Sequence, residues 1–264
     1  MLMERCEIIG KVASHLQASH DSEGAQACLQ WLNASYLHAV FASESGLDHE
    51  SGVTLEFVFE CLRDENALPP TVPARSATKL INLWRTMKQL RFHEFPVADE
   101  PPLPLSLNLV TALHATVMEG LLNNAGELRS TFVSAAKTNV MYLPPQLIRT
   151  HLVALLEFTS CRLAECSTVL DRMLLAVFFF SDFLKIHPFV NGNGRVARLL
   201  ANALLRGVAV VPFTPAGVGA ADRERYLVAI SESQWQSNHM LLIELFVAAG
   251  AAAAGHASWM VGVP

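Results

Sequence analysis

The sequence predicts an all-α protein with one β-hairpin, and three observations lead to this prediction. Apolar residues recur at helical spacing through most of the chain, two proline-rich stretches divide it, and a single short segment has β-prone ends around a polar turn. The 264-residue chain is 52% hydrophobic, which argues against intrinsic disorder and for a packed core. Its length suits one large domain with a smaller annex.

The two proline-rich stretches set the expected domain boundaries. They read ALPPTVP at residues 67–73 and FPVADEPPLP at residues 95–104. Prolines at this density end helices and mark connections. We therefore expect an N-terminal helical annex at residues 1–95, a main domain at 105–250 and an Ala/Gly-rich tail at 251–264.

The main domain is expected to begin with two amphipathic helices. Ser106 can cap the first, because the residues after it recur at i, i+3 and i+4 on one apolar face. That face consists of Leu109, Ala112, Leu113, Val117 and Leu121. Pro144 and Pro145 suit the first turn of the second helix, since proline is tolerated where the backbone N–H has no helical partner.

Two further helices and the hairpin complete the prediction. Residues 170–184 are apolar nearly all round, which indicates a helix buried at the centre of the domain. Residues 195–206 form the next helix, with Gly207 as its C-terminal stop. Residues 129–142, RSTFVSAAKTNVMY, have β-prone ends around SAAKTN and are predicted to form the hairpin.

Charge and cysteine content exclude several classes of protein. The formal net charge of −5 excludes nucleic-acid binding through a broad basic surface, but leaves room for a local anion site. The five cysteines include no CxxC pair, which predicts reduced thiols in a cytoplasmic protein. The N-terminus lacks the pattern of a signal peptide. The apolar tail from Leu245 to Val263 is marginal for a membrane span, so we expect a packed or frayed terminal helix.

Residues 187–198, HPFVNGNGRVAR, carry the chemistry that the sequence indicates. Pro188 ends the preceding helix beside a histidine, and the glycines of GNG let the backbone bend sharply toward a ligand. The next helix begins at this loop, so its unpaired amides and its dipole favour an anion such as phosphate. Arg195 and Arg198 project from one face of its first turn, and His187 is a candidate general base.

This run resembles the signature of the Fic-domain family, HPFx(D/E)GNGRxxR, at every defined position except Asn191. Leu113–Arg129, followed by Tyr142–Pro145, resembles the segment that leads into the family's flap hairpin. Asp222–Ile230 resembles the later R..Y..A helix. The resemblance covers residues 105–250 and implies a Fic-type helical domain with one β-hairpin flap, joined to the N-terminal helical annex.

The resemblance implies a protein adenylyltransferase, which transfers AMP from ATP to a hydroxyl side chain of a target protein and releases pyrophosphate. His187 would deprotonate the hydroxyl, and Phe189 would anchor the loop in the core. The loop amides, the Asn193 side chain and two arginines would bind the phosphates. The residues assigned to nucleotide binding are Gly192, Asn193, Gly194, Arg195 and Arg198.

Asn191 stands where the family signature has an acid that binds Mg²⁺. An amide oxygen can ligate Mg²⁺, but without the charge attraction of a carboxylate. We expect activity with ATP and Mg²⁺ at weaker metal affinity. The alternatives are removal of AMP, transfer of another nucleotide or phosphate-linked group, and a non-catalytic module that binds nucleotide without turnover.

The resemblance also implies partners and a regulatory segment. The flap at 129–142 would align the backbone of the target protein by strand addition. Many relatives carry an inhibitory helix with the pattern (S/T)xxxE(G/N), and the annex offers Glu44 as the first candidate and Glu50 as the second. We expect a target protein and ATP as partners, with no nucleic acid and no membrane, and a homodimer is compatible with the sequence.

Overall fold

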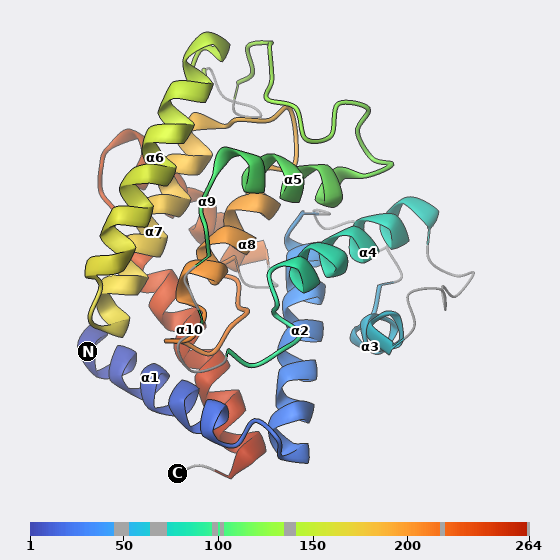
Figure 1. The fold of residues 1–264 in the computed structure, drawn as a ribbon, viewed down its shortest axis with the longest axis vertical. Helices are drawn as coiled ribbons and strands as arrows, with labels where there is room; N and C mark the ends of the chain where they lie inside the picture. Colours follow the sequence, from blue (N-terminus) through green and yellow to red (C-terminus); the bar gives the residue numbers. More distant parts are fainter. Residues whose placement is uncertain are drawn as a thin grey trace.

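The computed structural model describes residues 1–44, 53–63, 73–96, 100, 103–134, 141–216 and 220–262. Within these residues the chain is all-α, with an N-terminal group of four helices followed by six more (Figure 1). The helices are α1 Leu2–Ala18, α2 Glu23–Glu44, α3 Leu55–Arg63, α4 Ala74–Gln89, α5 Leu107–Met118, α6 Pro145–Glu165, α7 Val169–Ile186, α8 Asn193–Leu205, α9 Ala220–Trp235 and α10 Met240–Val261.

Helix α7 is the central helix, as its uniform apolarity predicts. It contacts α1, α6, α8, α9 and α10, and ten of its residues are buried. A capping box fixes its start: the Thr168 hydroxyl accepts from the Asp171 N–H at 3.0 Å, and the Asp171 carboxylate accepts from the Thr168 N–H at 3.0 Å. The helix ends at His187, whose backbone is left-handed at φ 50°. This ending turns the chain into the loop of residues 187–192.

The other predicted helix ends are confirmed or corrected by local backbone conformation. The Ser106 hydroxyl accepts from the Leu109 N–H at 3.1 Å, so Ser106 caps α5 as expected, and α6 begins at Pro145. The prediction that Leu121 continues α5 is wrong, because the helix ends at Met118 and Gly120 turns the chain at φ +66°. Helix α8 begins two residues earlier than predicted, because Gly192 turns the chain at φ +80° directly before it.

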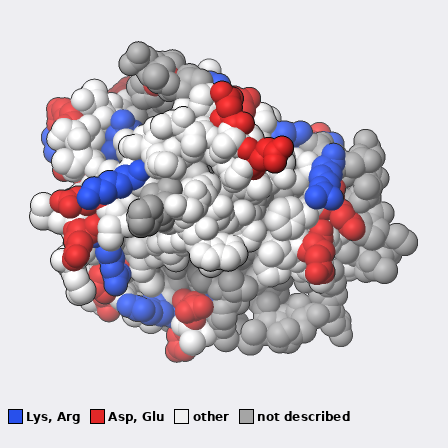
Figure 2. Space-filling view, turned by 90° about the horizontal axis from the view of Figure 1, so that it is seen from below, with Lys and Arg blue, Asp and Glu red and all other residues white. Residues whose placement is uncertain are grey.

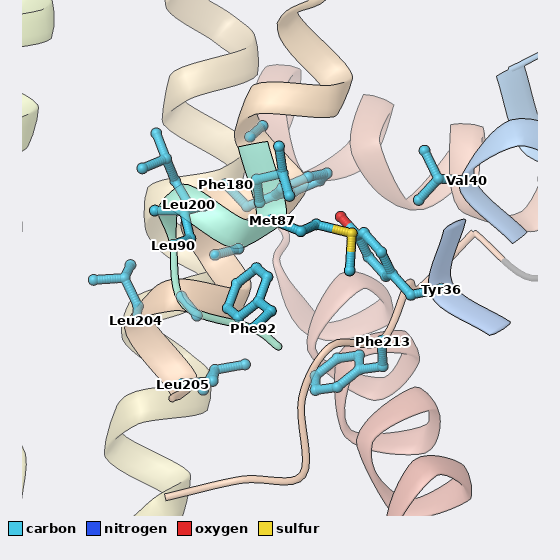
Figure 3. Packing of buried hydrophobic residues seen from close by; sticks show 14 of the residues in the cluster. Tyr36, Val40, Met87, Leu90, Phe92, Phe180, Leu200, Leu204, Leu205 and Phe213 are labelled. Atoms are coloured by element: carbon cyan, nitrogen blue, oxygen red, sulfur yellow. The ribbon is translucent and has the colours of Figure 1, made fainter. Parts of the chain in front are cut away.

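The annex and the main domain share one hydrophobic core. Figure 3 shows Met87 of α4 between Phe180 of α7 and Tyr36 of α2, with residues of α8 and of the segment after it in the same cluster. The labelled residues of α8 and its following segment are Leu200, Leu204, Leu205 and Phe213. The boundary between residues 95 and 105 stays a prediction, but packing joins its two sides.

The C-terminal helix α10 packs against α1, α2, α7 and α9, and includes most of the predicted tail. Buried Ala253, Ala254 and Ala257 line its contact face, as expected for a packed terminal helix. Among the described residues, α10 is long and apolar enough to cross a membrane, by length and composition alone. A core helix of a water-soluble protein meets the same requirements, so its apolarity does not decide the question.

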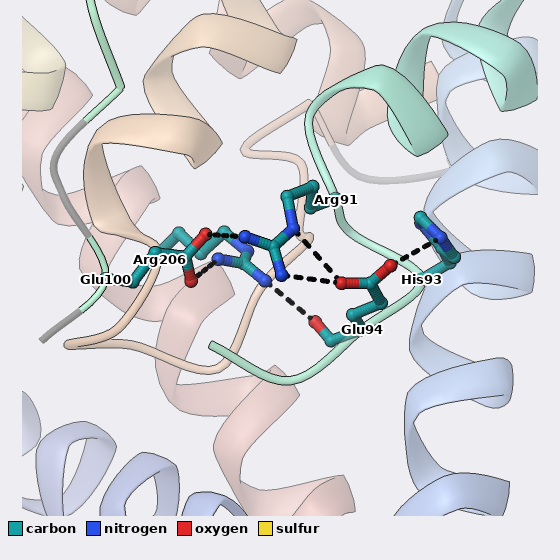
Figure 4. Close-up of polar contacts among 5 residues, drawn as sticks. All are labelled: Arg91, His93, Glu94, Glu100 and Arg206. Atoms are coloured by element: carbon teal, nitrogen blue, oxygen red, sulfur yellow. Dashed lines mark hydrogen bonds and ion pairs between the residues drawn. The ribbon is translucent and has the colours of Figure 1, made fainter. Parts of the chain in front are cut away.

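A polar cluster joins the end of α4 to the end of α8 (Figure 4). Arg206, the residue after α8, pairs with the Glu100 carboxylate and donates to the Glu94 carbonyl at 3.1 Å. Arg91 bridges the Glu94 and Glu100 carboxylates at 2.8 and 2.9 Å. The hydrogen bond from Arg91 lowers the pKa of Glu94 below its ordinary value. These groups tie the annex to the main domain at the protein surface.

The described ends of the predicted hairpin lie close together. Ser134 and Met141 form an isolated antiparallel bridge, and the Tyr142 N–H donates to the Val133 carbonyl at 3.1 Å. Residues 135–140 lie outside the described residues, and the described residues contain no strand. The pairing is compatible with a flap, whose complete form stays a prediction.

The face seen from below carries mixed charges. Figure 2 shows Lys and Arg interspersed with Asp and Glu around a broad uncharged centre. The described residues of this face carry charges of both signs, in agreement with the net charge of −5.

Candidate functional site

The predicted motif lines a cleft of about 400 Å³ between α7, α8 and α9. The cleft brings together His187, the loop and both arginines of the motif, together with residues of α9 that the motif does not contain. Its lining residues are Tyr142, Leu184, His187, Val190, Asn191, Gly192, Asn193, Gly194, Arg195, Arg198, Arg223, Tyr226, Leu227, Ile230 and Gln234.

His187 is held as a neutral imidazole with a defined tautomer. Its Nδ1 lies 3.2 Å from the Leu184 carbonyl oxygen, and because a carbonyl only accepts, the ring proton lies on Nδ1. The lone pair is therefore on Nε2. The ring stacks on Tyr142 with centroids 3.9 Å apart, and burial lowers the pKa of His187 to about 4. The residue thus offers a basic nitrogen that stays unprotonated near neutral pH.

Arg129 fixes the backbone on which His187 sits. Its guanidinium donates to the carbonyls of His187 and Ile186 at 2.7 and 3.3 Å. It also donates to the carbonyls of Thr131 and Leu143 at 2.8 and 2.5 Å, one on each side of the flap. The residue is 2% exposed. Arg129 therefore joins the end of α7 to the base of the flap, a role that the sequence does not reveal because His187 and Ile186 lie 58 and 57 residues away.

The loop before α8 is closed by Asn193 and Phe189. The Asn193 Oδ1 accepts from the Phe189 N–H at 3.0 Å, and its Nδ2 donates to the Phe189 carbonyl at 2.8 Å. Phe189 is fully buried, as the expected anchor role requires. The Asn193 side chain therefore closes the loop in this structure, and its expected contact with phosphate stays a prediction. Its backbone N–H, like that of Gly194, belongs to the first turn of α8.

His114 of α5 supports the same loop from below. Its Nδ1 accepts from the Gly126 N–H at 2.8 Å, so its proton lies on Nε2, which donates to the Asn191 carbonyl at 3.0 Å. The ring stacks on Phe189 with centroids 3.7 Å apart, and burial lowers its pKa to about 4. The sequence signal was a histidine within an apolar helical face. This signal alone does not reveal its role, because its partners Gly126 and Asn191 lie 12 and 77 residues away along the chain.

Both oxygens of Asn191 accept hydrogen bonds. Its Oδ1 accepts from the Gly192 N–H at 2.7 Å, and its main-chain oxygen accepts from His114. Among the lining residues that the structure describes, none is Asp or Glu, and the described chain contains no group of three metal-ligating side chains. The described residues of the cleft therefore do not fit a resident Mg²⁺.

Three arginines give the cleft its positive charge. Arg195 and Arg198 lie on the first turns of α8 and are 7% and 4% exposed. The Arg198 Nη1 lies 3.5 Å from the Tyr226 hydroxyl of α9. Arg223 reaches the same cleft from α9. The R..Y..A pattern predicted this helix, but the sequence did not reveal that Arg223 faces the motif.

The two inhibitory candidates are not tested by the geometry. Glu44 is the last residue of α2, and its side chain lies outside the described part of the chain. Glu50 lies outside the described residues altogether. Autoinhibition therefore stays a prediction.

Comparison with a family model decides what kind of domain carries this site. The model of the Fic/DOC family matches residues 104–205, which extend from before α5 to the end of α8. The chain contains a Fic domain. The matched region of this Fic domain includes the loop, both arginines of α8, and the two supporting residues His114 and Arg129.

Two curated relatives agree with this assignment. A Fido domain-containing protein of Dictyostelium discoideum is 28% identical over 134 residues, which cover 48% of this chain and 89% of that protein. A protein of Aquifex aeolicus named as a probable protein adenylyltransferase is 34% identical over 159 residues, 58% of this chain and 45% of that protein. The matched part of the chain spans less than half of the Aquifex protein.

Solved structures show that the fold extends through the annex. Fic-1 of C. elegans, residues 134–508, superposes with a TM-score of 0.77 at 14% identity. The superposition covers 99% of this chain and 73% of the Fic-1 chain. A Fic domain-containing signaling protein of Bacteroides thetaiotaomicron gives a TM-score of 0.69 at 18% identity, covering 97% and 99%. BepC of Bartonella tribocorum, solved with AMPPNP bound, gives a TM-score of 0.50 at 16% identity, covering 64% and 82%.

Proposed function

We propose that this protein is an adenylyltransferase that transfers AMP from ATP to a hydroxyl side chain of a target protein. One observation carries the proposal: a neutral imidazole with its lone pair on Nε2 borders the same cleft as the first turn of α8 and two buried arginines. The cleft thus combines a base with a phosphate-binding site. The AMPPNP bound to BepC and the name of the Aquifex relative support a nucleotide donor.

The chemistry assigns each group a step. The first-turn amides of α8, with Arg195 and Arg198, bind the phosphates and hold the α-phosphorus near His187. The target hydroxyl oxygen forms a bond to the α-phosphorus, while the bond from that phosphorus to the bridging oxygen of pyrophosphate breaks. The hydroxyl proton moves to Nε2 of His187. The arginines stabilise the negative charge that builds up on the leaving pyrophosphate.

The test is transfer of label from α-³²P-ATP by the full chain and by His187→Ala. Because the base is lost and the phosphate site is kept, we expect transfer to fall by about 10²–10⁴-fold. Affinity for ATP should stay within about twofold. His20→Ala, at an exposed histidine of the annex, is the matched control and should transfer like the wild type. Equal transfer by His187→Ala and wild type would contradict the proposal.

We further propose that a glutamate at the end of the annex restrains this activity. Glu44 ends α2, the annex helix whose Tyr36 packs in the shared core. Label transfer by Glu44→Gly and Glu50→Gly, compared with the wild type, identifies the inhibitory residue. An increase in one variant is the expected result, and equal transfer in all three proteins would contradict autoinhibition.

The proposed docking site for the target is the flap. Phe132 and Met141, beside the antiparallel bridge, are 59% and 55% exposed and offer apolar contacts next to His187 and Tyr142. A target strand pairing with this edge would present its hydroxyl at the cleft. We place this activity in the cytoplasm, in keeping with five free cysteines, of which three are buried.

A further inference from the structure

We infer that the cleft neutralises the phosphates of its donor with arginines and not with a divalent cation held by the chain. The inference rests on the proposed function for the nature of the donor. It concerns the position at which the chain departs from the family signature, Asn191, and a residue outside the motif, Arg223.

Each oxygen of Asn191 accepts a hydrogen bond. The side-chain Oδ1 accepts from the Gly192 N–H at 2.7 Å, and the main-chain oxygen accepts from His114 Nε2 at 3.0 Å. Turning the amide oxygen toward a cation would break the first bond and leave the Gly192 amide without that partner. An uncharged amide gains little from a hard cation in return. The geometry therefore gives Asn191 a structural role, closing the turn that begins α8.

The charges around the cleft also oppose a cation. Arg195, Arg198 and Arg223 line it, and no carboxylate does so among the described residues. Arg195 and Arg198 are buried, so solvent screens their charges less than it would at the surface. Three guanidiniums favour a diphosphate or triphosphate over a divalent cation.

Arg223 supplies the third charge from a separate element. Arg195 and Arg198 lie on α8. Arg223 lies on α9, one turn before Tyr226, which also lines the cleft. A phosphate chain in the cleft can therefore receive guanidinium hydrogen bonds from two helices. We assign Arg223 as a binding residue for the phosphates of the donor.

The inference is tested by calorimetric titration of the full chain with ADP, in excess Mg²⁺ and in excess EDTA. Mg²⁺ lowers the charge of ADP, so we expect wild-type affinity in EDTA to equal or exceed that in Mg²⁺. Asn191→Asp introduces a carboxylate ligand and should bind ADP about tenfold more tightly in Mg²⁺ than in EDTA. Asn108→Asp, the same change at an exposed position of α5, is the control and should behave like the wild type.

Arg223→Gln gives a second measurement on the same protein. Loss of a charged donor should weaken ADP binding about tenfold, by the same factor with and without Mg²⁺. Unchanged ADP affinity in Arg223→Gln would contradict its assignment.

The outcomes separate this inference from the proposed function. Wild-type binding that strengthens tenfold or more with Mg²⁺ would overturn the inference and leave the nucleotide donor intact. No ADP binding by the wild type in either buffer would overturn both the proposed nucleotide donor and the inference that depends on it.

Discussion

The loop of residues 187–192 and the contact between α1 and α10 are stabilised by different forces. Polar side chains hold the loop: Arg129 and His114 bind its carbonyls, and Asn193 bonds to both polar groups of the Phe189 backbone. Apolar and small residues hold the helix contact, where Gly250 of α10 lies against Ile9 of α1. Hydrogen bonds depend on direction and apolar burial does not. Loss of one polar partner should therefore disrupt the structure of the loop, whereas truncation of one apolar side chain should only loosen the helix contact.

The largest expected effect is that of Arg129→Met. It removes the donor of four carbonyl groups around His187 and the flap, which should lower the free energy of unfolding by about 3–5 kcal/mol. Urea unfolding measures the loss. ADP binding by the folded protein should also be lost, because the backbone at Ile186 and His187 would no longer be held in place and the loop would shift.

Ile9→Ala is the matched change at the α1–α10 contact. We expect a similar loss of stability, about 2–5 kcal/mol, because Ile9 is fully buried. ADP affinity of the folded protein should be unchanged. If Ile9→Ala weakens ADP binding as much as Arg129→Met does, the two regions are not independent and the comparison fails.

The pH dependence of stability should report on the loop. The pKa of His114 is about 4 in the folded protein, against about 6.5 for an unperturbed histidine, so between these values the unfolded chain binds more protons. Stability is therefore complete above about pH 6.5 and falls as the pH approaches 4, by about 3 kcal/mol for this residue. Urea unfolding across this range measures the slope.

His114→Gln separates titration from hydrogen bonding. The amide can accept and donate in place of the imidazole but does not titrate. The acid-side loss of stability should therefore be smaller in His114→Gln than in the wild type. His15→Gln, at an exposed histidine of α1, is the control. A slope that is identical in wild type and His114→Gln would show that His114 does not cause the acid loss.

Two left-handed glycines test how tightly the loop is packed. A Cβ at Gly192 would lie 2.8 Å from the Met118 Sδ and 3.3 Å from the His114 Nε2, whereas a Cβ at Gly207 would meet nothing within 4 Å. Both positions have positive φ, so alanine is strained at each by about 1–2 kcal/mol. Gly192→Ala should cost about 1–3 kcal/mol more than Gly207→Ala in thermal or urea unfolding. Equal losses of stability in the two variants would mean that Met118 and His114 can move aside for the added methyl group.

The smallest effect is expected in α10. A Cβ at Gly255 would meet nothing within 4 Å, so Gly255→Ala should stabilise the protein by about 0.5–1 kcal/mol through helix propensity. At Gly250 a Cβ would lie 3.0 Å from Met173 Cε and 3.2 Å from Ile9 Cδ1. Gly250→Ala should therefore gain less stability than Gly255→Ala. An equal gain in both variants would show that the α1–α10 contact has room for a methyl group.

The sequence by itself determined the helices of the main domain and the loop between α7 and α8. The signals were local: a capping serine at Ser106, a proline at the start of α6, an apolar run for α7, and Gly192 before α8. Each acts through backbone preferences and contacts within a few residues, which are readable without a fold.

Only the tertiary structure decided how the loop is held and what its side chains do. Arg129 and His114 bond to carbonyls 58 and 77 residues away, and Arg223 reaches the cleft from another helix. The sequence showed that Asn191 lacks a charge, but not that its oxygen binds the Gly192 amide. Hydrogen-bond partners, tautomers and shifted pKa values depend on which groups packing brings together and removes from water, and that is fixed only when the helices assemble.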